Sequence, residues 1–241
     1  MEEVIRGVVL GGVNYGENDK ILNIFTLEKG ILSARIKGVK KAGAKLKFAS
    51  EPFCFIEFVF SRTGDRRTVI GASLIDSFYP IREDIKRYYS ATTVTEFVRA
   101  FSQENVFSPD LFVLLCQTLK TLAYGNDSAC RVVSEFLIKA LSIVGYGLNL
   151  NGCGSCGCLE ITGRTYFDYN SGCFYCDDCF NGAGREIQNT TYLAFCDLQS
   201  DLPVSDQSLT KVLKLLDYYV TNKTETVLKS LKELLSLCSV A

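Results

Sequence analysis

Four cysteines in two closely spaced pairs are the side chains of this chain with the clearest capacity for chemistry. Cys153-Gly-Ser-Cys156 is followed, after 19 residues, by Cys176-Asp-Asp-Cys179. Two thiolates separated by two residues reach one metal ion from a single tight turn, and two such turns supply the four sulfur ligands of a tetrahedral zinc site. The chain contains no His, so a mixed cysteine-histidine site is excluded. The spacing therefore predicts one zinc ion bound by Cys153, Cys156, Cys176 and Cys179.

Two further cysteines lie beside these pairs and leave alternatives open. Cys158 or Cys173 could replace a ligand, although Cys158 follows Cys156 too closely and a Cys173–Cys176 pair would leave Cys179 unused. A cluster of free or oxidised thiols is the alternative to a metal site, and the spacing does not match those of ferredoxin iron-sulfur clusters. The other five cysteines lie at apolar positions, where we expect small buried side chains: Cys54, Cys116, Cys130, Cys196 and Cys238.

A zinc ion held by four cysteines has no open coordination position, so the predicted site is structural rather than catalytic. The absence of His also excludes Ser-His and Cys-His catalytic couples. Neither a phosphate-binding Gly-rich loop nor a GxSxG turn occurs in the sequence. These observations predict that the protein is not an enzyme, while a metalloenzyme with an open metal position stays an alternative.

The second group of candidate residues is a run of cations near the N-terminus. Residues 35–47 contain six basic side chains and no acidic one: Arg35, Lys37, Lys40, Lys41, Lys45 and Lys47. The Gly and Ala residues between them indicate a flexible connection, and cations without a counter-acid attract phosphates through counterion release. Arg62, Arg66 and Arg67 could extend this surface for DNA binding. The alternative is a solvated basic loop without a ligand.

The elements that must position these cations are short strands. Residues 4–13, 20–27, 31–37, 53–60 and 67–75 are rich in β-branched and aromatic side chains and are separated by turn residues. Five short strands with little helix between them predict a closed barrel of the OB type, and an SH3-like barrel would give nearly the same pattern. In an OB barrel such loops flank a face that binds single strands, where Tyr15, Phe25 and Phe48 are candidate platforms for stacked bases.

From residue 81 onward the apolar residues recur with the period of helices. Ser108-Pro109 and Asp127 are expected to cap two helices, and apolar stripes predict two more near residues 209–220 and 227–235. Between the cysteine pairs, the segment TGRTYFDYNSGCFY predicts the strand-turn-strand of a zinc ribbon.

The expected fold class is therefore α+β, with four segments along the chain. They are an OB-fold β-barrel (1–80), the first part of a helical domain (81–150), an inserted four-cysteine zinc ribbon (151–185) and the C-terminal part of the helical domain (186–241).

Composition and charge limit the remaining classes of protein. A chain that is 47% hydrophobic and 22% charged is expected to fold. A net charge of -1 argues against a uniformly basic nucleic-acid-binding protein, so such binding must rest on residues 1–80, which hold 12 basic and 9 acidic side chains. We recognise no export signal and no apolar stretch that would span a membrane, so we expect a cytoplasmic protein.

Several short motifs follow one another along nearly the whole chain. They are 7–10 (GVVL), 15–22 (YGENDKIL), 25–30 (FTLEKG), 37–41 (KGVKK), 51–53 (EPF), 81–87 (IREDIKR), 111–115 (LFVLL) and 145–146 (GY). Together with the two cysteine pairs, this combination resembles the RecO family of bacterial recombination mediators. Gly11 departs from the pattern, because the family commonly has Arg there.

The resemblance implies a non-catalytic role in recombinational DNA repair at the nucleoid. Proteins of this family bind single- and double-stranded DNA, anneal complementary strands, associate with RecR, and engage the acidic tail of the single-strand binding protein to help load RecA. Because Gly11 and the overall acidity remove positive charge, we expect weaker affinity for bare DNA in this chain. A zinc-ribbon transcription or translation accessory factor is the alternative, although it would not need the long helical middle.

For the acidic, apolar-ended tail we expect a binding site on the helical domain. Residues 82–99 combine cations with aromatic side chains, and on a single helix Arg82 and Lys86 would share a face with Tyr89 close by. The candidate partner-binding residues are Arg82, Lys86, Arg87 and Tyr89. The alternative is that Glu83, Asp84 and Glu96 pair with these cations on a solvated surface.

Overall fold

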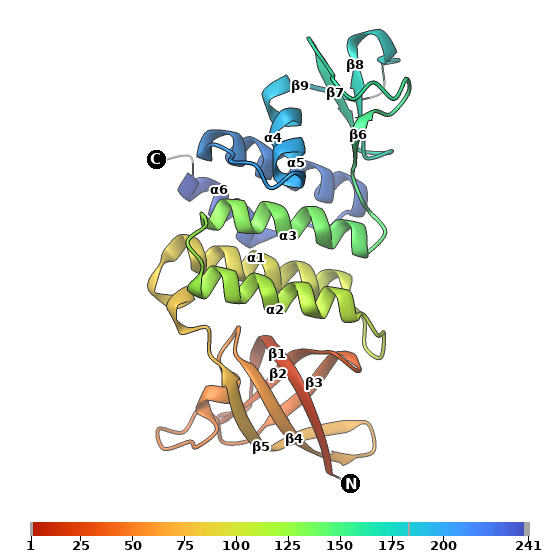
Figure 1. Ribbon diagram of the computed structural model, residues 1–241. Coiled ribbons are helices and arrows are strands. Elements are labelled where there is room, and N and C mark those ends of the chain that lie inside the picture. Colours follow the sequence, from red (N-terminus) through yellow and green to blue (C-terminus); the bar gives the residue numbers. More distant parts are fainter. Residues whose placement is uncertain (1, 183, 239–241) are drawn as a thin grey trace. The chain divides into compact units, whose positions relative to one another are not determined.

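The computed structural model describes residues 2–182 and 184–238. Two compact units, Met1–Asn126 and Asp127–Ala241, divide the chain. The first contains the barrel strands and two helices, and the second contains the other helices and a small sheet (Figure 1). The boundary between the units falls inside the segment 81–150, and the four-part division predicted from the sequence stays a prediction.

Five strands form the barrel of the first unit: β1 (Glu2–Tyr15), β2 (Asp19–Thr26), β3 (Gly30–Ile36), β4 (Phe55–Thr63) and β5 (Arg66–Asp76). They close in the order β1-β2-β3-β5-β4, and every neighbouring pair is antiparallel except β3 with β5. This connectivity is that of the OB fold, which confirms the first alternative and excludes the SH3-like barrel. All five predicted strands are present, with ends shifted by one to three residues.

Two glycines explain how the chain makes this barrel. A register shift between Val9 and Gly11 marks a bulge in β1, and Gly11 has a φ of 143° that other residues rarely adopt. The bulge bends β1, so that it pairs with β4 from Glu2 and with β2 up to Tyr15. At the β2–β3 turn, Gly30 has a φ of 61°, and a Cβ atom there would lie 2.4 Å from the Val106 carbonyl oxygen.

Alternating apolar side chains of the strands fill the barrel. Leu22, Ile24 and Leu32 are fully buried, and the rings of Phe58 and Phe60 stack inside with centroids 5.4 Å apart. Phe58 and Phe60 of β4 therefore belong to the core. A short 3-10 helix, η1 (Lys47–Ser50), adds the fully buried Ala49 to the same cluster.

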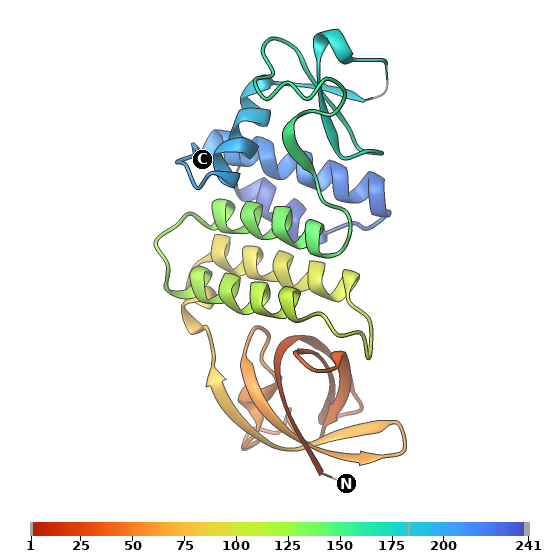
Figure 2. The same ribbon diagram turned by 45° about the vertical axis from the view of Figure 1, so that its right-hand side comes forward.

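Two antiparallel helices complete the first unit, α1 (Ile85–Phe101) and α2 (Pro109–Tyr124), and both ribbon views show them side by side (Figures 1 and 2). Asp84 caps α1, because its carboxylate accepts a 2.8 Å hydrogen bond from the Arg87 backbone N–H. Ser108 is the residue before α2, as predicted, but its side chain makes no capping bond. Pro109, with its fixed φ and no N–H, suits the first turn of the helix.

The second unit surrounds helix α5 (Asp206–Thr224), whose buried stripe includes the predicted Leu209, Val212, Leu213, Leu216 and Val220. Helix α3 (Ala129–Ile143) and a four-stranded sheet lie on opposite sides of α5 (Figures 1 and 2). The sheet has the order β6-β8-β7-β9. Its strands and the remaining helices are β6 (Asn149–Cys153), β7 (Thr165–Asp168), β8 (Cys173–Cys176), β9 (Arg185–Ile187), α4 (Asn189–Gln199) and α6 (Lys229–Cys238).

Three helix starts in the structure differ from the sequence-based expectations. Ser128, not Asp127, caps α3, and its hydroxyl accepts a 3.2 Å bond from the Arg131 N–H. Helix α4 was not predicted at all. Helix α6 starts at Lys229, which leaves Val227 outside the helix and 44% exposed.

No helix within residues 2–182 and 184–238 has the length and apolar character needed to cross a membrane.

Candidate metal and nucleic-acid sites

The four cysteines predicted as ligands come together at the tip of the small sheet. The Sγ atoms of Cys153, Cys156, Cys176 and Cys179 all lie within 4.8 Å of one another. Tetrahedral zinc with Zn–S bonds of about 2.3 Å needs sulfur atoms about 3.8 Å apart. The Cys156 and Cys176 sulfurs already lie 3.9 Å apart. The donor set therefore fits one tetrahedral metal ion.

Strand β6 and the turn after it present the first cysteine pair. Cys153 ends β6, and its N–H donates to the Cys158 carbonyl at 2.8 Å while its own carbonyl accepts from the Gly157 N–H at 2.9 Å. Gly157 has a φ of 71°, which suits a glycine in this tight turn. These bonds direct Cys153 and Cys156 to the same side of the loop.

Strand β8 and the short helix η3 (Asp177–Cys179) present the second pair. The rings of Tyr166 and Phe180 stack with centroids 3.7 Å apart, and the Tyr166 hydroxyl donates to Asp177 at 3.0 Å. Strands β7 and β8 pair antiparallel, which confirms the strand-turn-strand predicted between the cysteine pairs. The site is thus supported by residues outside the four ligands.

The surroundings of the thiols shift their pKa values in different directions. Burial opposes ionisation of Cys153, but the N–H groups of Cys156, Cys176 and Ser155 lower its pKa to about 6. For Cys176, burial and the neighbouring Cys179 thiol raise the pKa to about 12. Without a metal ion the cluster therefore keeps protons on some sulfurs, and a bound cation displaces them.

Cys158 and Cys173 lie outside this cluster. The Cys158 thiol is exposed and donates to the Glu160 carbonyl at 3.2 Å. The Cys173 thiol donates to the Ser171 carbonyl at 3.6 Å. Of the five cysteines expected to be buried, Cys54 and Cys130 are buried, while Cys116, Cys196 and Cys238 are partly exposed.

The predicted basic connection forms a series of hydrogen-bonded turns instead of an irregular loop. The Lys41 N–H donates to Gly38, the Ala44 N–H to Lys41, and the Lys47 N–H to Ala44, at 3.1 to 3.3 Å. Val39, within the segment, is only 2% exposed and belongs to the barrel core. The turns therefore hold the lysines on the outside of the barrel.

All five lysines of this segment are exposed: Lys37, Lys40, Lys41, Lys45 and Lys47. Within the residues that the structure describes, none of them pairs with a carboxylate. Their charge is thus available to a ligand from solution.

Arg35 has a different environment, because it pairs with Asp19 through a 2.8 Å bond from its Nε atom. Its guanidinium group also lies 4.8 Å from the centre of the Tyr15 ring. The Asp19 carboxylate accepts a 2.7 Å bond from the Gly38 N–H, so it joins the β1–β2 turn to the start of the basic segment. The Gly38 N–H, and then Arg35, lower the pKa of Asp19 below its usual value.

The three arginines proposed to extend the surface are not equivalent. Arg66 is exposed, whereas Arg67 is 8% exposed and forms a 3.2 Å ion pair with Glu104. Arg62 donates to the Gly64 carbonyl at 2.9 Å within its own turn. Because β5 pairs with β3 in parallel, Arg66 lies on the strand next to the one that carries Arg35. Arg67 is therefore a poor candidate for DNA contact.

The three aromatic residues predicted to stack on bases differ in their exposure to solvent. Phe25 is fully buried and packs against Phe112 at 5.8 Å, so the prediction that it could stack on a base is wrong. Phe48 packs against the barrel core. Tyr15 is 48% exposed and lies beside Arg35.

Comparison with known proteins agrees with this arrangement of barrel, helices and cysteine cluster. The family models "Recombination protein O N terminal" and "Recombination protein O C terminal" match residues 1–78 and 82–232. The chain belongs to the RecO family.

Relatives named "DNA repair protein RecO" align with most of this RecO-family chain. The Bacillus pumilus protein is 29% identical, with 94% of this chain and 91% of the relative aligned. The Acetivibrio thermocellus protein is 29% identical over 91% of this chain and 90% of the relative. The Rubrobacter xylanophilus protein is 31% identical over 74% and 71% of the two chains.

The predicted partner-binding residues of this RecO-family chain do not lie on one helix. Arg82 is in the 3-10 helix η2 (Tyr79–Glu83), before α1, so the prediction that Arg82 and Lys86 share a helix face is wrong. The Arg82 Nη1 atom donates to the Ser77 carbonyl at 2.8 Å, and Nη2 donates to the Pro52 carbonyl. Lys86 and Tyr89 do lie on α1.

Arg87 is also engaged within the first unit. Its guanidinium group donates to the carbonyls of Leu122, Ala123 and Gly125 at the end of α2, at 3.0 to 3.2 Å. These carbonyls have no partner within the helix, so Arg87 satisfies them. Its donors are thus directed at the protein rather than at solvent.

One pocket of this RecO-family chain could not be anticipated from the motifs of the sequence. It lies in the second unit, between β9 and α5, and includes Arg185, Lys211 and Tyr218. On α5, Lys211, Lys214 and Tyr218 recur at helical spacing beside the apolar stripe, which was the available indication. The residues of β9 gave no such pattern.

Proposed function

We propose that this chain is a non-catalytic DNA-binding protein of recombinational DNA repair. Its membership of the RecO family and the name "DNA repair protein RecO" of its relatives support the role in repair. The observation that carries the proposal is the OB barrel with exposed lysines at 37–47, held outward by turns and free of carboxylate partners in the described residues. Such a surface attracts the backbone phosphates of DNA whatever its base sequence.

The DNA-binding surface proposed here consists of the segment 37–47 with Arg35, Arg62 and Arg66, and Tyr15 as its aromatic platform. Exposed cations beside an exposed ring suit a single strand, whose phosphates and bases are both accessible. Phosphate contacts alone also allow binding of double-stranded DNA. Holding two single strands by their backbones leaves their bases free to pair, which accounts for strand annealing.

The proposed partners follow from the family. They are RecR, the acidic C-terminal tail of the single-strand binding protein, and, indirectly, RecA, which the chain would help to load at the nucleoid. For the tail, Lys86 and Tyr89 on α1 are the residues whose side chains we propose as contacts. Arg82 and Arg87 would act by holding the first unit together.

The proposed cofactor is one zinc ion held by Cys153, Cys156, Cys176 and Cys179. All four ligands are sulfur, a donor set that suits zinc, and it leaves no coordination position for substrate. The ion would join the two turns of the ribbon, and no step of the proposed function passes through it.

The proposal is tested by the salt dependence of DNA binding. Lys40→Gln/Lys41→Gln removes two exposed cations from the segment 37–47. If both contact phosphates, the slope of log K against log salt should fall by about 1.4 for single strands and about 1.8 for duplexes. The affinity for oligonucleotides of unrelated sequence should fall by a similar factor.

Lys120→Gln/Lys139→Gln provides the matched control. Both lysines are exposed on helices, α2 and α3, and the variant loses the same net charge. Its slope should stay at the parent value. Equal slopes for all three proteins would show that the segment is only solvated surface and would contradict the proposed DNA site.

A further inference from the structure

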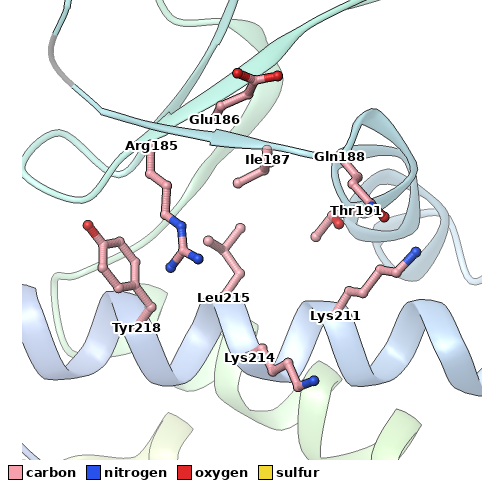
Figure 3. A pocket seen from close by; sticks show the side chains of 9 residues that line it. All are labelled: Arg185, Glu186, Ile187, Gln188, Thr191, Lys211, Lys214, Leu215 and Tyr218. Atoms are coloured by element: carbon pink, nitrogen blue, oxygen red, sulfur yellow. The ribbon is translucent and has the colours of Figure 1, made fainter.

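A pocket in the second unit has the composition of an anion site, and nothing in the proposed DNA interface uses it. It has a volume of about 290 Å³ and lies between β9, the start of α4 and one face of α5 (Figure 3). Small-ligand pockets span about 300–1,000 Å³. This one therefore has room for a ligand near the small end of that range.

Three cations line this pocket: Arg185, Lys211 and Lys214. Within the described part of the chain, none of the three forms an ion pair with a carboxylate. Glu186 is the acidic lining residue, and Figure 3 shows its carboxylate on the side of β9 that faces away from α5. The charge on the α5 side is thus positive.

A polar side chain without a partner lies at the same place. Thr191 is only 5% exposed, lines the pocket, and its hydroxyl makes no hydrogen bond in the residues that the structure describes. It belongs to the first turn of α4, where its own N–H already donates to the Gln188 carbonyl at 2.8 Å. The Thr191 hydroxyl, near the positive end of the helix dipole, is thus the donor that α4 offers to an anion in this pocket.

The floor of the pocket is apolar and aromatic. Leu215 and Ile187 lie between the two cationic ends in Figure 3, with Thr191 and Lys211 on one side and Arg185 and Tyr218 on the other. The Arg185 guanidinium group lies 5.4 Å from the centre of the Tyr218 ring. Such a surface accepts a flat, partly apolar group beside the anion.

We propose that this pocket binds the phosphoryl group of a single nucleotide, with the phosphate at Lys211 and the Thr191 hydroxyl and the base toward Leu215 and Tyr218. The chemistry is the same for a free mononucleotide and for the phosphorylated end of a strand. The pocket and the basic segment belong to different units, so a failure of one site does not imply a failure of the other.

The test is a titration of the full, zinc-loaded chain with dAMP, in which ligand-observed NMR measures binding. Deoxyadenosine, which lacks the phosphate, should bind at least about tenfold more weakly than dAMP. Arg185→Ala/Lys211→Ala should lower the affinity for dAMP by at least about tenfold. Thr191→Val should also lower this affinity, and its melting curve should match that of the parent. Lys120→Ala, an exposed lysine of α2, is the control and should bind like the parent.

Two oligonucleotides then distinguish the sources of the phosphate. A short strand with a 5′-phosphate that binds more tightly than dAMP and than the same strand with a 5′-hydroxyl identifies a strand end as the ligand. Equal binding of both strands, weaker than dAMP, identifies a free nucleotide. The proposal is overturned if neither dAMP nor the phosphorylated strand binds, if the variants bind dAMP like the parent, or if an acidic peptide binds this pocket in preference to both.

Discussion

Arg87 shows how a single side chain can join two helices. It lies on α1, and its guanidinium group donates to three carbonyls at the end of α2, where the helix itself provides no donors. Hydrogen bonds from charged donors contribute about 1.5–3 kcal/mol each when their loss leaves a group unsatisfied. Since water can replace some of these hydrogen bonds, Arg87→Met should lower the free energy of unfolding by about 1–3 kcal/mol in total.

Urea denaturation followed by circular dichroism measures this effect. Lys86→Ala is the neighbouring control on the same helix, and a surface change of this type should stay within about 0.5 kcal/mol. A midpoint for Arg87→Met equal to that of the parent would mean that the carbonyls are satisfied by water alone.

Asp19 gives the first unit a pH-dependent contact. Its carboxylate accepts from the Gly38 N–H and from Arg35, and these two bonds lower its pKa. The folded pKa thus lies below the unfolded value of about 3.9. The stabilisation is present above the unfolded pKa and is lost as the pH falls through the folded pKa. Asp19→Asn should therefore be less stable than the parent at neutral pH, and the two should converge in acid.

Urea midpoints of the parent and Asp19→Asn, measured between neutral pH and the onset of acid unfolding, test this sign. A difference that stays constant over the whole range would show that ionisation of Asp19 contributes nothing. Because the Gly38 N–H is one of the partners, hydrogen exchange of Gly38 should also become faster in the variant.

The four-cysteine ribbon has short strands, β6 to β9, with little core of their own. Binding of the proposed zinc ion would therefore contribute directly to its folding. Cys153→Ser should reduce zinc from one ion per chain to well below that, and should lower the melting temperature of the second unit by about 5 °C or more. Elemental analysis and calorimetry give both values.

Cys158→Ser is the control within the same loop. Its thiol bonds to the Glu160 carbonyl of that loop and lies outside the four-sulfur cluster, so zinc content and melting should match the parent. Loss of zinc in this variant, with retention in Cys153→Ser, would mean that the ligand set has been assigned wrongly.

Elements with strong local patterns could be predicted from the sequence, and those that depend on distant contacts could not. The five barrel strands and the four-cysteine cluster follow from alternation, turn glycines and cysteine spacing. Helix α4 was missed because Gln188 before it makes no capping bond, and the helix has no acidic residue in its first turn and no basic residue in its last turn. Arg82 was misplaced because its bonds to Ser77 and Pro52 depend on the barrel, which residues 82–99 do not reveal. Gly11, where the resemblance led us to expect Arg, has a positive φ that suits the β1 bulge.

At the scale of the whole molecule, the proposed tasks are divided between the two units. The exposed lysines at 37–47 belong to the first unit, and the cysteine cluster and the phosphate pocket belong to the second. Because the net charge of the chain is -1, the residues outside the basic segment carry a net negative charge, which repels DNA phosphates. DNA affinity should therefore depend steeply on salt and on those few lysines.

Removal of the metal ion separates these tasks experimentally. A zinc chelator should speed hydrogen exchange in residues 149–182 and 184–187, because the turns that carry the four cysteines lose the proposed ion that joins them. The barrel strands should keep their protection. The salt slope of DNA binding should also stay at the parent value, since the proposed phosphate contacts lie at 37–47. If the slope falls when zinc is removed, the ribbon itself contacts phosphates, and the DNA interface proposed here is too small.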